Sequence, residues 1–170
     1  MEKENPLVSI ITPCYNGENV MHRLLDSILS QTYSNIEFIL INDGSTDHSE
    51  EIWYQYEKKF NERGIKTIYI HQRSQGLGAA INPGLKVFTG DYLCWPDIDD
   101  YFEDTSVEKR VNFLETHKEY GSVSSDANQY MEDNLSEPVG TMASWLKHKE
   151  DEWQFEWLLK GQSLFCSGCH

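Results

Sequence analysis

The sequence has few basic residues and no long apolar run. Lys and Arg number 14 against 28 Asp and Glu among 170 residues, so the formal net charge is −14 at pH 7. Nucleic acid and anionic membrane surfaces attract proteins with a basic face, so neither is expected as the main partner of this acidic chain. No apolar stretch approaches the roughly 18 residues that cross a bilayer, and the polar residues 1–5 lack the apolar core of a signal peptide. These absences predict a cytoplasmic protein.

Cysteine is also scarce, with four residues in the chain. Without an export signal, a disulfide framework is not expected. Cys14 and Cys94 lie beside apolar runs and are predicted to be small buried residues. Residues 166–170 (Cys-Ser-Gly-Cys-His) have the form of a c-type haem attachment site, but nothing else in the sequence indicates a haem domain. A zinc site there lacks a second pair of ligands.

Strand-like and helix-like patterns alternate along the first 115 residues. Apolar, β-branched runs predict strands at 7–12, 36–41, 67–71 and 91–95. Apolar residues at helical spacing predict helices at 18–30, 47–62 and 78–87, the last weakened by Pro83, and one more helix from Thr105. Asp47 with Glu50, and Thr105 with Glu108, have the spacing of capping boxes. The alternation predicts an α/β fold with a mostly parallel sheet and helices on both faces.

The pattern weakens after about residue 125. We therefore predict an α/β region at 1–125 and a separate region at 126–170. In the second region, residues 147–160 are consistent with an amphipathic helix, and residues 164–166 with the beginning of a strand.

Polar segments follow three of the predicted strands, at residues 13–16, 42–47 and 97–100. In open parallel sheets, ligands bind beyond the carboxyl ends of the strands. The three segments are therefore expected to converge on one site, although they are far apart in the sequence.

The acidic segment at 97–100 holds three carboxylates in four residues. Such carboxylates repel one another unless a cation lies between them, and Mg²⁺ or Mn²⁺ prefers one or two carboxylates together with phosphate oxygens. If the chain is extended here, alternate residues share a side, so Asp97 and Asp99 would face one site and Asp100 would turn away. The alternative is a solvated acidic loop that caps the following helix.

Three further residues are candidates for binding a nucleotide. Asp43 could accept a hydrogen bond from a base N–H, or could belong to a simple turn before a helix capped by Asp47. Tyr15 could stack on a base or pack in the core. Gly76 permits close approach of the backbone to a ligand, or lies in a plain loop.

Taken together, these segments resemble a large family of inverting glycosyltransferases, family 2, which makes bacterial capsule, lipopolysaccharide and hyaluronan-type products. The matching residues are 13–16 (Pro-Cys-Tyr-Asn), 43–47 (Asp-Gly-Ser-Thr-Asp), 79–82 (Ala-Ala-Ile-Asn), 90–92 (Gly-Asp-Tyr) and 97–100 (Asp-Ile-Asp-Asp). The resemblance covers residues 7–114. Five positions depart from the family pattern: Asn42 replaces Asp, Ile81 replaces Arg, Trp95-Pro96 precedes the acidic segment, and Asp104 stands where Pro is common.

The resemblance implies a GT-A (Rossmann-like) fold and a nucleotide-sugar donor, with a UDP-sugar expected. It also implies that residues 1–125 are the nucleotide-sugar-binding α/β domain and that residues 126–170 begin the acceptor-side region. Tyr15 and Asp43 would bind the base, Asp97 would lie near the ribose or sugar, and Asp99 would bind Mg²⁺ or Mn²⁺. The wider set of nucleotide-binding residues would be Pro13, Tyr15, Asp43, Gly76, Asn82 and Asp97.

The catalytic base of an inverting transfer is not evident. The family takes this carboxylate from a region downstream of a Gly-rich strand, and Ser167-Gly168 resembles the beginning of that strand. The base is therefore expected beyond His170, in a protein truncated at its C-terminus. Asp126 and the acidic residues 150–152 are possible replacements, although the latter are more simply explained as a solvated helix start.

The expected activity is transfer of a sugar, with inversion, to a glycan or lipid-linked acceptor in cell-surface polysaccharide synthesis. Membrane association through further sequence or a partner is compatible with this activity. One alternative is a nucleotidyltransferase, but residues 13–18 lack the basic, Gly-rich loop that holds a triphosphate. Another is a non-catalytic domain that binds sugar nucleotides.

Overall fold

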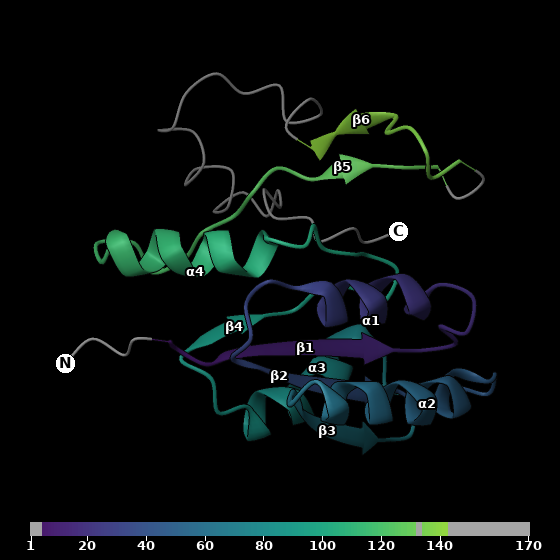
Figure 1. Cartoon of the computed structure of the whole chain (residues 1–170). Helices are drawn as coiled ribbons and strands as arrows, with labels where there is room; N and C mark the ends of the chain where they lie inside the picture. Colours follow the sequence, from purple (N-terminus) through teal and green to yellow (C-terminus); the bar gives the residue numbers. More distant parts are fainter. Residues whose placement is uncertain (1–4, 132–133, 143–170) are drawn as a thin grey trace. The chain divides into compact units, whose positions relative to one another are not determined.

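The computed structural model describes residues 5–131 and 134–142 (Figure 1). Their contacts divide the chain into two units, with the boundary between Glu119 and Tyr120. In the second unit, the described residues include one short antiparallel pair, β5 (Asn128–Gln129) and β6 (Gly140–Thr141). The helix predicted at 147–160, the strand predicted at 164–166 and the Cys-His segment 166–170 lie outside the described residues. Among the described residues, no helix is both long and apolar enough to cross a membrane.

The first unit contains a four-stranded sheet in the order β3-β2-β1-β4, and every neighbouring pair is parallel. The strands are β1 (Val8–Cys14), β2 (Ile36–Asn42), β3 (Lys66–His71) and β4 (Tyr92–Cys94). Every residue of the two central strands, β1 and β2, is buried. Continuous burial explains why these strands are mainly apolar rather than alternating, with a few buried polar exceptions at Ser9, Thr12, Glu37 and Asn42. The predicted parallel sheet is confirmed.

Helices cover both faces of this sheet, as predicted (Figure 1). They are α1 (Met21–Ser30), α2 (Ser49–Glu62), α3 (Leu77–Val87) and α4 (Ser106–Thr116). The larger core lies on the face of α1, α2 and α4, where Phe38, Trp53 and Phe60 pack together. On the other face, under α3, Ile11, Ile39 and Ile41 form a smaller core that half-buried Ile81 extends. An apolar core position therefore accounts for isoleucine at position 81.

Several predicted boundaries were wrong. β1 continues through Pro13 to Cys14. Proline is tolerated there because β4 pairs with β1 only over Val8–Ile10, which leaves one edge of β1 free at Pro13. α1 begins at Met21 rather than at Glu18; a turn precedes it, in which the backbone N–H groups of Val20 and Met21 both donate to the Gly17 carbonyl.

Neither predicted capping box forms in full, although Asp47 Oδ1 accepts a hydrogen bond from the backbone N–H of Ser49, the first residue of α2, at 3.0 Å. The side chain of Glu50 accepts a hydrogen bond from the Tyr69 hydroxyl instead of returning to the start of α2. The side chain of Thr105 makes no capping bond, and Glu108 accepts a hydrogen bond from Thr32. In both cases the glutamate carboxylate that was expected to bind the N-terminus of its own helix accepts a hydrogen bond from a residue distant in the sequence.

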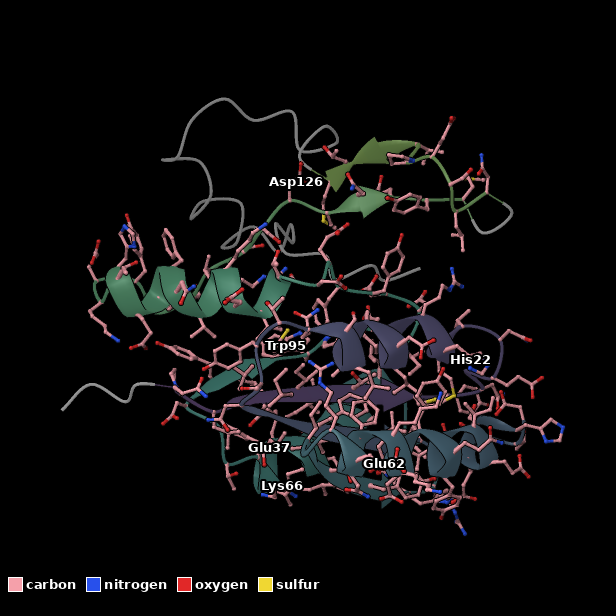
Figure 2. The ribbon with its side chains drawn as sticks, viewed as in Figure 1. His22, Glu37, Glu62, Lys66, Trp95 and Asp126 are labelled. Carbon is pink, nitrogen blue, oxygen red and sulfur yellow. The ribbon has the colours of Figure 1, made fainter. Side chains whose placement is uncertain are left out.

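A buried carboxylate closes the amino-terminal end of the sheet. The side chain of Glu37 is fully buried and accepts hydrogen bonds from Ser9 Oγ at 2.6 Å, Lys66 Nζ at 3.0 Å, and both the N–H and the hydroxyl of Thr89 at 2.5 and 2.9 Å (Figure 2). Burial alone raises the pKa of Glu37, but these hydrogen bonds outweigh it and lower the pKa to about 2. The carboxylate thereby joins β1, β2, β3 and the connection from α3 to β4.

The two cysteines in the described residues are both free. Cys14 is buried, as predicted, whereas Cys94 is partly exposed. Burial raises the pKa of the Cys14 thiol, so this side chain is a neutral part of the core at neutral pH.

Candidate functional site

Four loops follow the carboxyl ends of the strands in the first unit. They are the β1–α1 loop (15–20), the β2–α2 loop (43–48), the β3–α3 loop (72–76) and the β4–α4 loop (95–105). β2 lies on one side of β1 and β4 on the other, so the strand order reverses at β1. In open α/β sheets this reversal opens a crevice for ligands. The candidate site is therefore expected where the loops after β1 and β4 separate.

The β1–α1 loop packs directly on the acidic segment of the β4–α4 loop. A Cβ atom on Gly17 would lie 2.9 Å from Cys14 Sγ and 3.1 Å from Ile98 Cγ1. Both separations are shorter than a relaxed contact, so only glycine lets the loop approach Ile98 this closely. This contact brings the first and third predicted polar segments together.

The β1–α1 and β2–α2 loops exchange hydrogen bonds in both directions through Asn16. The backbone N–H of Asn16 donates to Ser45 Oγ at 3.0 Å, while Asn16 Oδ1 accepts from the backbone N–H of Thr46 at 2.8 Å. Asn16 has a φ of +52°, a left-handed conformation that asparagine adopts more readily than most residues. The side chain and the backbone conformation of Asn16 thus serve the same contact.

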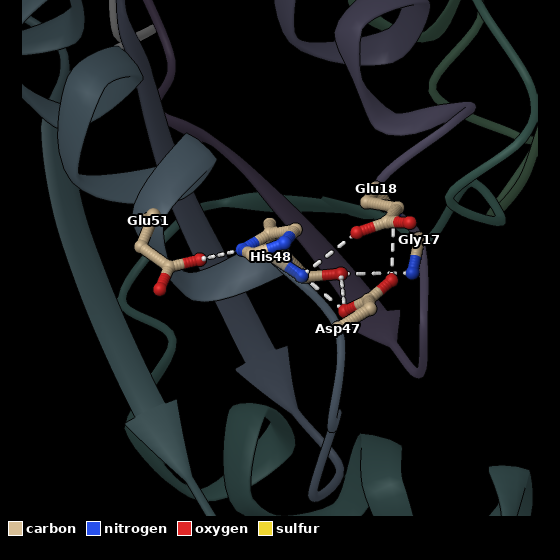
Figure 3. A network of polar contacts seen from close by, with 6 residues as sticks. Gly17, Glu18, Asp47, His48 and Glu51 are labelled. Carbon is tan, nitrogen blue, oxygen red and sulfur yellow. Dashed lines mark hydrogen bonds and ion pairs between the residues drawn. The ribbon is translucent and has the colours of Figure 1, made fainter.

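Glu18 repeats this reciprocal pattern two residues later (Figure 3). The backbone N–H of Glu18 donates to Asp47 Oδ2 at 3.0 Å, and Glu18 Oε2 accepts from the backbone N–H of His48 at 2.9 Å. The His48 ring in turn contacts Glu51 at 2.9 Å. We call the contacts of Asn16 and Glu18 with residues 45–48 the loop clasp.

Asp43 holds the β3–α3 loop. Its carboxylate is almost completely buried and accepts hydrogen bonds from Gln72 Nε2 at 2.6 Å, Ser74 Oγ at 3.1 Å, and the backbone N–H groups of Gln75 and Gly76 at 3.2 Å. Burial by itself raises the pKa of Asp43, but these donors have the larger effect and lower it. Asp43 is therefore an ionised acceptor at neutral pH.

The Asn42 that replaces the family's Asp has a specific role. Its side-chain N–H donates to the Tyr69 hydroxyl oxygen at 2.8 Å, and its Oδ1 accepts from the backbone N–H of Ser45 at 2.8 Å. The Tyr69 hydroxyl is itself a donor to Glu50 at 2.9 Å. An ionised aspartate has no donor for the Tyr69 oxygen, so asparagine suits this position.

The acidic segment is a turn rather than an extended strand. The backbone N–H of Asp100 donates to the carbonyl of Asp97 at 3.2 Å, with Ile98 and Asp99 between them. The expectation that Asp97 and Asp99 alternate along an extended chain was therefore wrong. The segment also does not cap α4, which begins only at Ser106.

Negative charge accumulates at this turn. Asp99 is exposed, whereas Asp97 and Asp100 are partly buried. Burial, followed by the charges of Asp99 and Asp97, raises the pKa of Asp100 to about 6. The donor set consists of hard carboxylate oxygens, which suit Mg²⁺ or Mn²⁺.

The described residues do not form a closed metal cage. Among them, no group of three or more His, Cys, Asp or Glu side chains is arranged to hold a metal ion.

The other candidate residues differ in their exposure to solvent and in their contacts. Tyr15 has an exposed fraction of 57%, so the alternative that it packs in the core was wrong. Gly76 has a φ of +85° and immediately precedes α3, where its N–H reaches Asp43. Pro13 is buried within β1, and the exposed Asn82 donates to the carbonyl of Gly78 within α3.

Sequence reasoning did not single out several side chains that hold the site together. Gln72 and Ser74 bind Asp43, and Ser49 Oγ accepts from the backbone N–H of Gly17 at 2.9 Å. Their partners lie about 30 positions away in the sequence, so neither periodicity nor local turn chemistry could indicate them. Asp104 was noted only as a departure from the family; its side chain accepts a hydrogen bond from Ser30 at the end of α1.

Comparison with known proteins gives a consistent result. The sequence model of the family described as Glycosyl transferase family 2 matches residues 9–168. An uncharacterized glycosyltransferase of Rickettsia typhi is 43% identical over 110 residues, which are 65% of this chain and 32% of that protein. The glycosyltransferase GlyA of Streptococcus pneumoniae is 46% identical over 101 residues, which are 59% of this chain and 14% of that protein.

Solved structures share the fold. Residues 1–349 of TarS from S. aureus, in a crystal structure with UDP-GlcNAc, align with a TM-score of 0.59 and 26% identity over 66% of this chain and 32% of that chain. The present chain thus spans about a third of the length of this structure and a third or less of the two relatives.

Proposed function

Because this chain belongs to glycosyl transferase family 2, we propose that its first unit is the donor-binding part of an enzyme that transfers a sugar from a nucleoside diphosphate. The fold is of the GT-A type, with a parallel sheet between helices. The observation that carries the proposal is the linked set of loops at the carboxyl ends of four parallel strands. Together they present an aromatic ring, an ionised carboxylate and an acidic turn.

Tyr15 and Asp43 are proposed to bind the base of the nucleotide. The exposed Tyr15 ring offers a stacking surface. Ionised Asp43 can only accept hydrogen bonds, so it favours a base edge with a ring N–H, such as that of uracil. The crystal structure of TarS with UDP-GlcNAc supports a UDP-sugar as the donor. Pro13, Gly76 and Asn82 complete the proposed nucleotide-binding set.

The acidic turn is proposed to receive the diphosphate together with a divalent cation. Asp99, the exposed carboxylate, would bind Mg²⁺ or Mn²⁺, and Asp97 would lie near the ribose or sugar. A diphosphate alone would be repelled by a chain with a net charge of −14. When bound, the ion would supply a Lewis acid that neutralises the diphosphate and the departing nucleotide.

The acceptor side of the reaction is assigned to the part of the relatives' length that this chain does not span. This assignment includes the catalytic base, inversion at the sugar carbon, and the glycan or lipid-linked acceptor. Synthesis of a cell-surface polysaccharide and association with a membrane belong to the same proposal for the whole protein.

A thermal-shift screen of nucleotides with and without Mn²⁺ tests the donor assignment. We expect UDP and UDP-sugars to raise the Tm in Mn²⁺ and to have little effect in chelator, because ligand at about 100 times its Kd stabilises the folded state by roughly 2.7 kcal/mol. A larger shift with UTP than with any UDP-sugar would favour the nucleotidyltransferase alternative. If no nucleotide changes the Tm, the donor site is not in this chain.

A further inference from the structure

We propose that the loop clasp is the positioning element of the donor site, which fixes the Tyr15 ring relative to the Asp43 carboxylate. The clasp consists of Asn16 and Glu18 on the β1–α1 loop and residues 45–48 on the β2–α2 loop. The inference rests on the proposed function, because it assigns these residues a role in presenting the two groups that would bind the base.

Tyr15 and Asp43 occupy equivalent places on adjacent strands. Cys14 and Asn42 form the last register pair of β1 and β2, and Tyr15 and Asp43 each follow it directly. The backbone N–H of Asp43 still donates to the Cys14 carbonyl at 2.8 Å, so the two strands remain joined up to this point. Beyond this bond, the hydrogen bonds of the sheet no longer fix the distance between the β1–α1 loop and the β2–α2 loop.

The two groups differ in how they are held. The Asp43 carboxylate has four protein donors and is almost completely buried. The Tyr15 ring is exposed, and within the described part of the chain its hydroxyl has no hydrogen-bond partner and its ring no aromatic contact. The direction of the Tyr15 side chain therefore depends on its backbone, which the next residue, Asn16, controls.

The clasp supplies that control from both loops. Each loop contributes both donors and acceptors, so neither loop can shift without breaking bonds that the other loop provides. The left-handed conformation of Asn16 (φ of +52°) turns the chain immediately after Tyr15, and the bonds to Ser45 and Thr46 hold this turn. Two of the other bonds are from backbone N–H groups to the carboxylates of Glu18 and Asp47, which makes them charge-assisted.

Three variants distinguish the effect of losing the clasp hydrogen bonds from a general destabilisation of the loop. Asn16→Gly removes the Oδ1 acceptor and still accommodates the positive φ. Asn16→Asp retains an oxygen that can accept from the Thr46 N–H, and aspartate also tolerates this conformation. Asn19→Gly makes the matched change at an exposed asparagine on the same loop. Circular dichroism and thermal unfolding would establish that all three variants are folded.

A double-mutant cycle with Tyr15→Ala is the decisive measurement of positioning. We expect Asn16→Gly to raise the Kd for UDP in Mn²⁺ about fivefold, and by less than about twofold when Tyr15 is already alanine, because interacting residues give non-additive effects. Asn19→Gly should bind UDP as the unchanged chain does, and Asn16→Asp, which retains an acceptor, should lose less affinity than Asn16→Gly. Equal losses for Asn16→Gly in both backgrounds would show a merely structural role and would overturn the inference.

A ligand-free measurement separates this inference from the proposed function. Fluorotyrosine placed at position 15 should give one narrow ¹⁹F resonance, and Asn16→Gly should broaden or split it, whereas Asn19→Gly should not. If the resonance responds in this way but the chain binds no UDP, positioning is supported and the proposed donor is wrong. If UDP binds while Asn16→Gly changes neither the resonance nor the Kd, the clasp does not position Tyr15.

Discussion

Replacing Asp99 with alanine is expected to weaken UDP binding in Mn²⁺ by more than about tenfold. The physical reason is electrostatic: in a chain with a net charge of −14, the diphosphate needs a cation to offset repulsion, and Asp99 is the exposed carboxylate of the acidic turn. Isothermal titration calorimetry of the chain with UDP, first in Mn²⁺ and then in chelator, measures the effect. Asp99→Ala should bind equally weakly under both conditions.

The control removes a similar charge from the same loop. Glu103 is exposed on the β4–α4 loop, and its side chain forms no hydrogen bond or ion pair with any described residue. Glu103→Ala should therefore retain the Mn²⁺ dependence of UDP binding and change the Kd by less than about twofold, since screened surface charges contribute little. Equal UDP affinity for the unchanged chain in Mn²⁺ and in chelator would count against any metal role for Asp99.

Replacing Glu37 with alanine is expected to lower the free energy of unfolding by about 3 kcal/mol or more. The substitution removes a carboxylate whose side chain is fully buried and leaves Ser9 Oγ and the Thr89 N–H without their acceptor. Urea denaturation at neutral pH measures the loss. Glu62→Ala, at the exposed end of α2 (Figure 2), should change stability by less than about 0.5 kcal/mol. A loss at Glu37 no larger than at Glu62 would contradict the account of this network.

The same carboxylate predicts a pH dependence with a defined sign. The pKa of Glu37 is about 2 in the folded chain, below its ordinary value of 4.5, so the unfolded chain takes up this proton first as the pH falls. The contribution of the charge is complete above pH 4.5 and is lost as the pH falls toward 2. Over that window the stability difference between the unchanged chain and Glu37→Gln should shrink by roughly 3 kcal/mol. A difference that stays constant would mean that the ionised carboxylate is not the stabilising form.

The architecture of the first unit could be predicted because its two central strands, β1 and β2, are buried on both faces. Ile36–Asn42 is therefore apolar except for Glu37 and Asn42, and the alternation of strands with amphipathic helices fixes a parallel arrangement. The element ends could not be predicted. Asp47 and Glu50 have the spacing of a capping box, and Asp47 Oδ1 does accept from the N–H of Ser49 at the start of α2. Asp47 Oδ2, however, binds the Glu18 N–H and the Glu50 carboxylate binds the Tyr69 hydroxyl, and no local pattern records such tertiary partners.

The location of the site could be predicted from the topology of the sheet rather than from any single motif. The carboxyl ends of parallel strands lie at one edge of the sheet, so the convergence of the segments near Asn16, Asp43 and Ile98 could be predicted and is confirmed by their contacts. The internal geometry could not be predicted. An extended chain was assumed at Asp97 and Asp99, but a turn forms there, and the donors that Gln72 supplies to Asp43 have no signature in the sequence.

The central claim is that the four strand-end loops form one site for a nucleoside diphosphate and its metal ion. The most direct test is a titration of ¹⁵N-labelled chain with UDP and Mg²⁺, followed by NMR. The account predicts that amide resonances of residues 15–18, 43–48, 72–76 and 97–100 shift together with one Kd, while those of Thr89 and Gly90, at the opposite end of the sheet, do not move. Shifts confined to other residues, or different Kd values for the separate loops, would contradict it.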